Sequence, residues 1–261
     1  MDSALEVKER FGGIARLYGE PALKTLAQAH VCIIGIGGVG SWTAEALARS
    51  GVGAFTLVDL DEICVSNINR QIHAQEGTVG RSKIAVMAER IQAVNPVARV
   101  ISEERFFTAA TAEALLAPDY SMVVDAIDRV TPKCMIVAGC RQRRMPVVTV
   151  GGAGGRRDPT AIRCDDLSRS LEDPLLMQVR KKLRREFGFP RDLKKKFKVD
   201  AVFSLERPVY PEADGGICNQ PATRADLRLN CDTGYGTSAA VTGTYGLVAA
   251  SVVLRQILSG R

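Results

Sequence analysis

One segment of the chain bears most directly on its architecture: Val31-Cys32-Ile33-Ile34-Gly35-Ile36-Gly37-Gly38-Val39-Gly40-Ser41. Its first four residues are apolar and mostly β-branched, which predicts a buried strand, and the apolar spacing of residues 41–50 predicts a helix. A glycine-rich turn between a strand and a helix lets backbone N–H groups approach an anion, and the helix N-terminus adds a favourable dipole. We therefore predict a phosphate-binding cradle formed by Gly35, Gly37, Gly38 and Gly40. Such a turn occurs in many nucleotide-binding proteins, so by itself it does not specify the ligand.

Polar side chains follow the next predicted strand, Phe55-Thr56-Leu57-Val58. That strand ends in Asp59, 24 positions after Gly35, where a carboxylate can accept both ribose hydroxyls. An ordinary helix would follow in a dehydrogenase, whereas this chain places two cations, Arg70 and Lys83, near a cradle of triphosphate size. Each cation alone is compatible with a solvated surface, but the pair favours chemistry beyond hydride transfer. The other residues of this segment that we assign to nucleotide binding are Asp61, Asn69 and Gln71.

Two acids follow another short apolar run, Met122-Val123-Val124, which predicts a buried strand. Asp125 and Asp128 then lie at its carboxyl end, where open parallel sheets bind their ligands. Magnesium prefers one or two carboxylates together with phosphate oxygens, so an acid beside a polyphosphate is a natural ligand for it. Because Asp125 is also suited to cap the next helix, we choose Asp128 as the magnesium ligand.

The combined motifs resemble those of the ubiquitin-activating-enzyme-like adenylating enzymes, the superfamily that includes ThiF, MoeB and HesA. The shared pattern is G-x-G-G-x-G, D-x-D, S-N-x-N-R-Q, a lysine and D-x-x-D, and it runs from Gly35 to Asp128. The resemblance implies that these residues bind ATP and adenylate a carboxylate. On that basis we expect ATP to contact Gly35, Gly37, Gly38, Gly40, Asp59, Asp61, Asn69, Arg70, Gln71, Lys83 and Asp128, and catalysis to depend on Arg70, Lys83 and Asp128.

Further segments narrow the resemblance to one subfamily, called TcdA or CsdL, the tRNA threonylcarbamoyladenosine dehydratases. These segments are residues 10–19, 69–74, 151–155, 202–204 and 229–231. The resemblance implies ATP-dependent dehydration of threonylcarbamoyladenosine in tRNA, through adenylation of the threonyl carboxylate and ring closure, giving cyclic threonylcarbamoyladenosine next to the anticodon. It also implies a homodimer and leaves room for a sulfur-relay protein as partner.

Cys231 matches the cysteine of that subfamily in the pattern Asn-Cys-Asp-x-Gly-Tyr-Gly. It precedes a predicted helix, whose N-terminus would lower a thiol pKa, and many relatives transfer an activated acyl group to a cysteine. Ring closure within one nucleotide has an internal nucleophile and needs no such relay. Cys231 is therefore kept as a candidate catalytic residue, although a non-catalytic role is the favoured interpretation.

Strands expected near Val31, Phe55, Arg99, Met122 and Val147, with helical stretches between them, predict an α/β fold. We expect a Rossmann-like, doubly wound, mostly parallel sheet with an appended C-terminal α+β portion. The chain of 261 residues is expected to form one adenylating domain, with its nucleotide-binding part at about residues 25–155 and a tRNA-facing and C-terminal part at about residues 156–261.

Cysteine usage and hydropathy indicate the compartment. Seven cysteines are an odd number and include no C-x-x-C pair, which favours a reducing cytoplasm and argues against the structural zinc of some relatives. The polar N-terminus shows no secretory signal. Residues 233–254 carry no charge, and although this length could cross a bilayer, their Thr, Ser and Gly content favours a helix buried against the sheet. Peripheral membrane association stays open from the resemblance.

Positive charge is concentrated in residues 180–198, which hold ten Lys or Arg and two acids, a local net charge of +8 against +6 for the whole chain. Asp173 and Pro174 predict a helix start, and an apolar stripe on that helix leaves its basic residues facing elsewhere. A solvated helix face is one explanation; a phosphate-binding surface is favoured, because a cationic patch gains counterion-release free energy on a polyanion. We predict contacts to tRNA, and not to DNA, from Arg180, Lys181, Arg184, Arg185, Lys194, Lys195 and Lys196.

Two other classes of function remain as alternatives. One is an adenylyltransferase that activates the C-terminal glycine of a small sulfur-carrier or ubiquitin-like protein, against which the missing C-x-x-C pairs and the basic segment count. The other is a non-catalytic scaffold or a nicotinamide oxidoreductase, against which Arg70 and Lys83 count.

Overall fold

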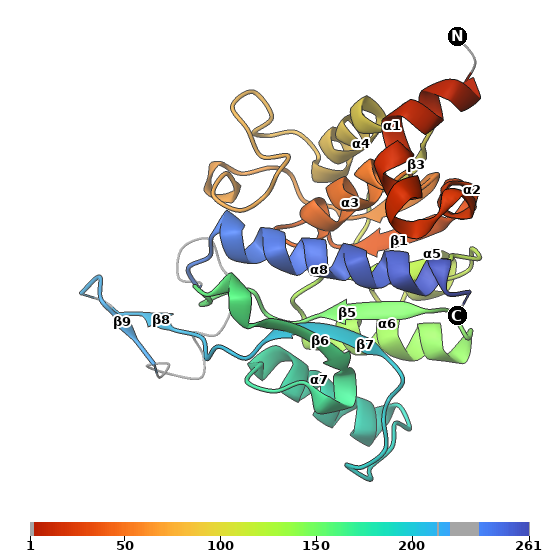
Figure 1. Ribbon diagram of the computed structural model, residues 1–261. Helices are drawn as coiled ribbons and strands as arrows, with labels where there is room; N and C mark the ends of the chain where they lie inside the picture. Colours follow the sequence, from red (N-terminus) through yellow and green to blue (C-terminus); the bar gives the residue numbers. More distant parts are fainter. Residues whose placement is uncertain (1–2, 213, 220–234, 261) are drawn as a thin grey trace.

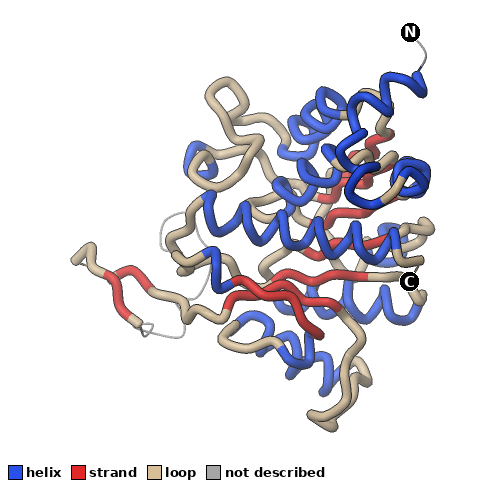
Figure 2. Tube along the Cα trace, viewed as in Figure 1, coloured by secondary structure: helices blue, strands red, loops and turns tan. Residues whose placement is uncertain are grey.

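The computed structural model describes residues 3–212, 214–219 and 235–260. Its centre is a seven-stranded sheet with the strand order β3-β2-β1-β4-β5-β7-β6, covered by helices on both faces (Figure 1, Figure 2). Six strands are parallel, and β6 runs antiparallel to β7. The strand bounds are β1 His30–Ile34, β2 Ala54–Val58, β3 Arg99–Glu103, β4 Met122–Asp125, β5 Val147–Val150, β6 Ile162–Asp166 and β7 Asp200–Ser204. The five strands predicted from the sequence and the Rossmann-like fold are confirmed.

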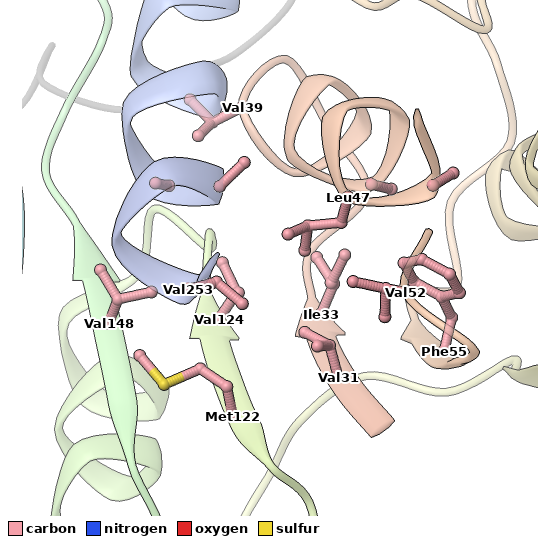
Figure 3. Packing of buried hydrophobic residues seen from close by; sticks show 14 of the residues in the cluster. Val31, Ile33, Val39, Leu47, Val52, Phe55, Met122, Val124, Val148 and Val253 are labelled. Carbon is pink, nitrogen blue, oxygen red and sulfur yellow. The ribbon is translucent and has the colours of Figure 1, made fainter. Parts of the chain in front are cut away.

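Side-chain alternation along the strands separates the core into two layers. Val31 and Ile33 of β1 point to one layer, where Val124 of β4 and Val148 of β5 join them, as Figure 3 shows. Cys32 and Ile34 point to the other layer. Because both faces of a parallel sheet are covered, these strands read as continuous apolar runs. The helices are α1 Ser3–Tyr18, α2 Glu20–Gln28, α3 Gly40–Arg49, α4 Lys83–Val94, α5 Ala112–Leu115, α6 Val130–Gln142, α7 Pro174–Glu186 and α8 Ala239–Leu258.

The C-terminal part of the chain shares this sheet. β6 and β7 extend it beyond β5, and α8 crosses the face that also carries α3 (Figure 1). A short hairpin of β8 Tyr210–Pro211 and β9 Ile217–Cys218 projects from the body. The described residues of the portion predicted as appended therefore form two further strands of the main sheet, the helices α7 and α8, and this hairpin.

Helix α8 is long and apolar enough to cross a membrane by length and composition, and it is the one such helix among the described residues. Its apolar side chains Val241, Tyr245, Ala249 and Val253 are fully buried against the sheet and α3. A Cβ at Gly246 would lie 2.6 Å from the Cβ of Trp42, so glycine lets the two helices approach closely. The predicted helix packed against the sheet is confirmed.

Candidate active site

The glycine-rich turn links the carboxyl end of β1 to α3. Gly35 has φ +92°, and a Cβ there would lie 2.9 Å from Ile127 Cγ2, while a Cβ at Gly40 would overlap the carbonyl oxygen of Gly35. Packing alone thus requires glycine at both positions. A Cβ at Gly37 would meet only Gln71 Nε2, at 3.9 Å. The N–H groups of Gly37 and Gly38 have no acceptor among the described residues. Two free donors at a helix N-terminus form an anion site.

Asp59, which follows β2, ties this turn to the neighbouring strand. Its Oδ2 accepts a hydrogen bond of 2.7 Å from the backbone N–H of Ile36, and its Oδ1 accepts one of 2.9 Å from that of Asp61. Each carboxylate oxygen retains a further lone pair. The predicted role of Asp59 in binding ribose hydroxyls is compatible with this geometry and stays a prediction.

Lys83 begins α4 and is buried, although the sequence alone was also compatible with a solvated cation there. Its Nζ lies 2.8 Å from Asp61 Oδ2, and its backbone N–H donates to the carbonyl of Asp61 at 3.1 Å. Glu62 and Ser82 form an antiparallel bridge beside this pair, which explains how residues so far apart in sequence meet. The lysine is linked to the glycine-rich turn through Asp61 and Asp59.

Arg70 is placed by its backbone. Its carbonyl oxygen accepts hydrogen bonds of 3.1 Å from Trp42 Nε1 of α3 and from Thr242 Oγ1 of α8. The guanidinium Nη1 donates to the carbonyl of Ser66 at 2.6 Å and to Asn69 Oδ1 at 3.1 Å. The backbone at Arg70 is therefore held by both α3 and α8, and the Arg70 side chain is half-buried.

The residues on either side of Arg70 differ in their surroundings. Asn69 is exposed, and its Nδ2 donates to the carbonyl of Thr237 at 3.0 Å. Gln71 is buried, with its amide nitrogen near Gly37 and with no partner for its Oε1 among the described residues. An unsatisfied buried amide beside the anion site is a group that a ligand could satisfy.

His73, two residues further on, is also buried. Neither ring nitrogen has a hydrogen-bond partner among the described residues. Burial, together with the positive charges of Lys83 and Arg90, lowers the pKa of His73 to about 4. The imidazole is therefore neutral at physiological pH.

The two acids after β4 occupy different environments. Asp125 is fully buried, and its Oδ2 accepts hydrogen bonds from Lys133 Nζ at 2.8 Å and Thr149 Oγ1 at 2.6 Å. Burial raises the pKa of Asp125, and the Lys133 charge opposes that rise. The alternative that Asp125 caps the next helix is wrong, because Arg129 occupies the N-cap position of α6. Asp128 is exposed.

Sequence reasoning missed Lys133. A signal was present, since Lys133, Ile136, Val137 and Cys140 follow helical spacing and share the buried face of α6. A lysine on an otherwise apolar helix face is buried only when the fold places hydrogen-bond acceptors or an opposite charge next to its ammonium group.

Helix α7 carries the first half of the basic segment and starts as predicted, with Asp173 accepting from the N–H of Leu176 at 2.9 Å. Two of its four predicted RNA-binding residues do not face solvent freely. Arg180 donates to Ser170 Oγ, and burial lowers its pKa. Arg184 donates to the carbonyl of Pro190 at 3.2 Å. The expectation that all four point away from the protein is therefore wrong for these two, while Lys181 and Arg185 are exposed.

The second half of the basic segment is a loop with Lys194, Lys195 and Lys196 exposed. Asp166 fixes its end by accepting hydrogen bonds from the backbone N–H groups of Phe197 at 2.9 Å and Lys198 at 2.7 Å. The Phe197 ring packs edge to face against the Phe189 ring, with centroids 4.9 Å apart. Buried aromatic side chains thus hold a loop whose lysines face outward.

Cys231 lies outside the described residues. Among the cysteines that the structure describes, Cys32, Cys64, Cys134, Cys140 and Cys164 are free thiols. Cys218 in β9 is half-buried, with its Sγ 3.7 Å from the carbonyl oxygen of Tyr210. Among the described residues no group of three His, Cys, Asp or Glu side chains could hold a metal ion.

Comparison with known proteins extends the likeness over the whole chain. The tRNA threonylcarbamoyladenosine dehydratase of Escherichia coli (strain K12) is 49% identical over 253 residues, which are 97% of this chain and 94% of that protein. The protein of the same name from Haemophilus influenzae is 45% identical over 251 residues, 96% of this chain and 94% of its own. The solved structure of E. coli TcdA in complex with ATP matches with a TM-score of 0.86 at 45% identity, covering 97% of this chain and 95% of that one. The ThiF family model matches residues 13–260, so the resemblance seen in the motifs is confirmed and the chain belongs to the ThiF family.

Proposed function

We propose that this protein catalyses the ATP-dependent dehydration of threonylcarbamoyladenosine in tRNA, giving the cyclic form of the nucleoside. The observation that carries the proposal is 49% identity, over 97% of the chain, to an enzyme of that name. The site supports the nucleotide-dependent part. Its glycine-rich turn offers two unpaired backbone donors, and Asp59 and Asp61 link that turn to Lys83.

The chemistry that suits this site is carboxylate adenylation. A carboxylate oxygen of the threonyl group attacks the α-phosphorus of ATP, and pyrophosphate leaves. The ureido group of the same nucleotide then attacks the acyl carbon, a ring forms, and AMP leaves with the carboxylate oxygen. The transition state at phosphorus gains negative charge, which Arg70 and Lys83 stabilise. Asn69 and Gln71 orient the phosphates, and ring closure gains from proximity because both groups belong to one nucleotide.

Asp128 is the residue that would hold a magnesium ion. Its carboxylate is exposed at the carboxyl end of the sheet and has no hydrogen bond or ion pair among the described residues. One free carboxylate suits magnesium, which takes its remaining ligands from phosphate oxygens and water. A bound magnesium ion would neutralise phosphate charge; no zinc is part of this proposal.

The partner surface for tRNA is the basic segment. Lys181, Arg185 and the loop lysines Lys194, Lys195 and Lys196 face solvent and can neutralise phosphates. A folded anticodon loop presents unstacked bases, so such a surface can deliver the modified adenosine to the nucleotide site.

The proposal extends to assembly and location. We infer a homodimer in the cytoplasm. Peripheral membrane association and binding of a sulfur-relay protein are two further properties to be tested. The odd number of cysteines and the absence of a C-x-x-C pair in the sequence support a reducing compartment. Sedimentation at micromolar concentration should give a dimer; a monomer would count against this assembly.

The direct test is mass spectrometry of nucleosides from tRNA carrying threonylcarbamoyladenosine, incubated with the protein and ATP. The expected product is lighter than the substrate nucleoside by one water, and it forms only with ATP. Incubation with a small carrier protein ending in Gly-Gly tests the alternative. A stable complex and an adenylated carrier, without change in the tRNA, would overturn the proposal.

Thermal-shift measurements address the remaining class of alternatives. ATP should raise the midpoint of unfolding, because a ligand that binds only the folded state stabilises it by mass action. NAD should not. A rise with NAD and none with ATP would favour a nicotinamide enzyme.

A further inference from the structure

Four buried charged groups lie where β4 and β5 end, and the proposed chemistry uses none of them. They are Asp125 and Lys133, which are fully buried, and Arg156 and Asp173, which are each 3% exposed. Buried ion pairs are weak sources of stability, because desolvation offsets their attraction and apolar replacements are often neutral. Their presence at the functional edge of the sheet therefore calls for another explanation.

Lys133 contacts both strands. Its Nζ lies 2.8 Å from Asp125 Oδ2, 3.3 Å from the carbonyl oxygen of Asp125 and 3.2 Å from Thr149 Oγ1. These three acceptors match the three donors of an ammonium group. Thr149 in turn donates to Asp125 Oδ2 at 2.6 Å. The cluster thereby connects the last residue of β4 to β5.

The segment after Asp125 forms a wall of the nucleotide cradle. The N–H of Ala126 donates to the carbonyl of Ile34 at 2.9 Å, and a Cβ on Gly35 would lie 3.0 Å from the carbonyl oxygen of Ala126. Asp128 follows two residues later. A shift at Asp125 would therefore move both the support of the glycine-rich turn and Asp128.

The segment after Thr149 leads into the loop of residues 151–155, which a second carboxylate holds. Asp173 Oδ2 accepts from the N–H of Gly152 at 2.9 Å, and a side chain on Gly151 would overlap that oxygen. Asp173 also begins the basic helix α7. Burial raises the pKa of Asp173, and the nearby charges of Arg156 and Lys133 oppose that rise.

We propose that Lys133, with Asp125 and Thr149, is a positioning cluster that holds the segment 126–128 and the loop 151–155 in a fixed relation. The inference rests on the proposed function. There the nucleotide lies beside the segment 126–128, and the threonyl carboxylate must approach the α-phosphorus in line with the departing pyrophosphate. Small misplacements of reacting groups are costly, since a shift of about 1 Å can cost about 10²-fold in rate. The cluster acts through these segments and does not touch the reacting atoms.

Two variants of one residue give the sharpest test. Thr149→Val keeps the shape of the side chain and removes one acceptor of Lys133, whereas Thr149→Ser keeps the hydroxyl. We expect Thr149→Val to fold, to bind ATP within about threefold of wild type and to lose about tenfold in kcat. Thr149→Ser should retain kcat. A double variant, Asp125→Asn with Lys133→Met, removes both charges and should lose more in kcat while remaining folded.

A second buried pair provides a matched control. Glu45 of α3 and Arg90 of α4 lie 2.7 Å apart, with Glu45 4% exposed, and they belong to neither segment. Glu45→Gln with Arg90→Met should lower the unfolding midpoint without lowering kcat. Wild-type kcat in both Thr149→Val and the double variant would show a purely structural cluster and overturn the proposal. A fall in ATP affinity equal to the fall in kcat would also overturn it.

Hydrogen exchange tests the same inference without the tRNA reaction. In the ATP-free protein, Thr149→Val should accelerate amide exchange in residues 126–129 and 151–155 about tenfold relative to Thr149→Ser, with the rest of the sheet unchanged. Uniform acceleration, or none, would contradict the positioning role. Failure of wild-type protein to convert the tRNA would refute the proposed function, while this measurement would still decide whether the cluster fixes the two segments.

Discussion

The cations of the site differ from ordinary surface charges in how they are held. Lys83 is almost fully buried, yet its partner Asp61 has a side chain that is 52% exposed. Removing the lysine leaves a carboxylate that water can solvate, so the fold should tolerate the change. The same holds for Asp128, which has no partner among the described residues. Function and folding can therefore be separated at both residues.

We expect Lys83→Ala and Asp128→Ala each to lose about 10²-fold or more in turnover, by analogy with the loss of one transition-state donor. Unfolding midpoints should stay near that of the wild type. Lys8→Ala is the control, since Lys8 forms an exposed pair with Glu20 at 3.7 Å. Steady-state rates and thermal unfolding check the prediction, and wild-type turnover in either variant would remove that residue from the site.

His73 predicts an acid-dependent loss of stability. The pKa of His73 is about 4 in the folded protein, whereas an unperturbed histidine, as in the unfolded chain, has a pKa of 6.5. The unfolded chain therefore takes up the proton first as the pH falls. Stability attributable to His73 therefore declines from pH 6.5 to about pH 4 and is constant below. Between pH 7 and pH 5 the loss is about 2 kcal/mol. In His73→Asn the denaturation free energy should fall less over this range, and equal slopes would contradict the assignment.

Sequence patterns identified the residues of the glycine-rich turn, but they did not identify the buried pair of Asp125 and Lys133. Gly35 and Gly40 are required by local backbone geometry, which a short motif encodes. Lys133 and Asp125 meet because α6 packs back on β4, and that contact depends on the tertiary fold. Arg180 illustrates the same limit, since helical spacing predicted an outward side chain and Ser170, from a preceding turn, accepts its hydrogen bond. Spacing along one helix carries no information about such a neighbour.

At the scale of elements, the basic segment divides into two parts. In helix α7 some cations donate hydrogen bonds to other parts of the protein, whereas the lysines of the following loop are exposed to solvent. Arg184 lies over the Phe197 ring, 4.8 Å from its centroid, and Arg141 lies over Phe189 at 4.3 Å. These contacts make Arg184 part of the support for the loop. Lys194, Lys195 and Lys196 are the better candidates for phosphate contacts.

Replacing these three lysines with alanine should weaken tRNA binding and reduce its salt dependence. Each lost phosphate contact lowers the log–log salt slope by roughly 0.7 to 0.9. ATP binding should survive, because the glycine-rich turn follows β1, whereas the lysine loop leads into β7, three strands away from β1 in the sheet order. A control with the same charge change is Lys8→Ala with Lys24→Ala and Arg99→Ala. An unaltered slope in the loop variant would remove the physical reason for placing RNA on this segment.

Helix α8 yields a prediction about packing. Gly246→Ala should raise helix propensity, yet its Cβ would lie 2.6 Å from Trp42 Cβ and 2.7 Å from the carbonyl oxygen of Val39. Overpacking typically costs about 1–3 kcal/mol, and contacts this short, one of them to backbone, place the cost in the upper part of that range, above the propensity gain of about 1 kcal/mol. Leu247→Ala, on a side chain that is 52% exposed, is the control and should change little. Denaturant unfolding measures both, and a stabilised Gly246→Ala would mean that α8 does not pack on α3 as described.

The first five strands and their parallel pairing were predictable from the sequence pattern, since helical or loop segments separate each predicted strand from the next. Their order in the sheet is known only from the structure. The antiparallel β6 could not be predicted in this way. Residues 162–166 read Ile-Arg-Cys-Asp-Asp, a short polar run at the sheet edge, where one face of the strand is solvated. The position of α8 over α3 likewise depends on glycines at 243 and 246, whose contacts with Trp42 are visible only in the folded structure.

On the scale of the whole molecule, the two parts of the chain are joined by one sheet and one helix. β7 pairs with β5, and α8 covers α3, β4 and β5, so the C-terminal part completes the core of the nucleotide-binding part. A fragment ending at residue 155 would expose the faces of α3 and β5 that α8 and β7 now bury. We expect such a fragment to aggregate.

The intact chain should therefore unfold in one transition. Trp42 is the sole tryptophan; it belongs to α3 and faces α8, where a Cβ on Gly243 would be 3.5 Å from its ring. Its fluorescence reports the contact between the two parts, while far-ultraviolet circular dichroism reports the helices and strands of both. Coincident urea transitions are expected, because each core layer contains side chains from both parts of the chain, so neither part has a core of its own. An earlier fluorescence transition would mean that α8 separates before the sheet melts, and it would divide the molecule into two units at that helix.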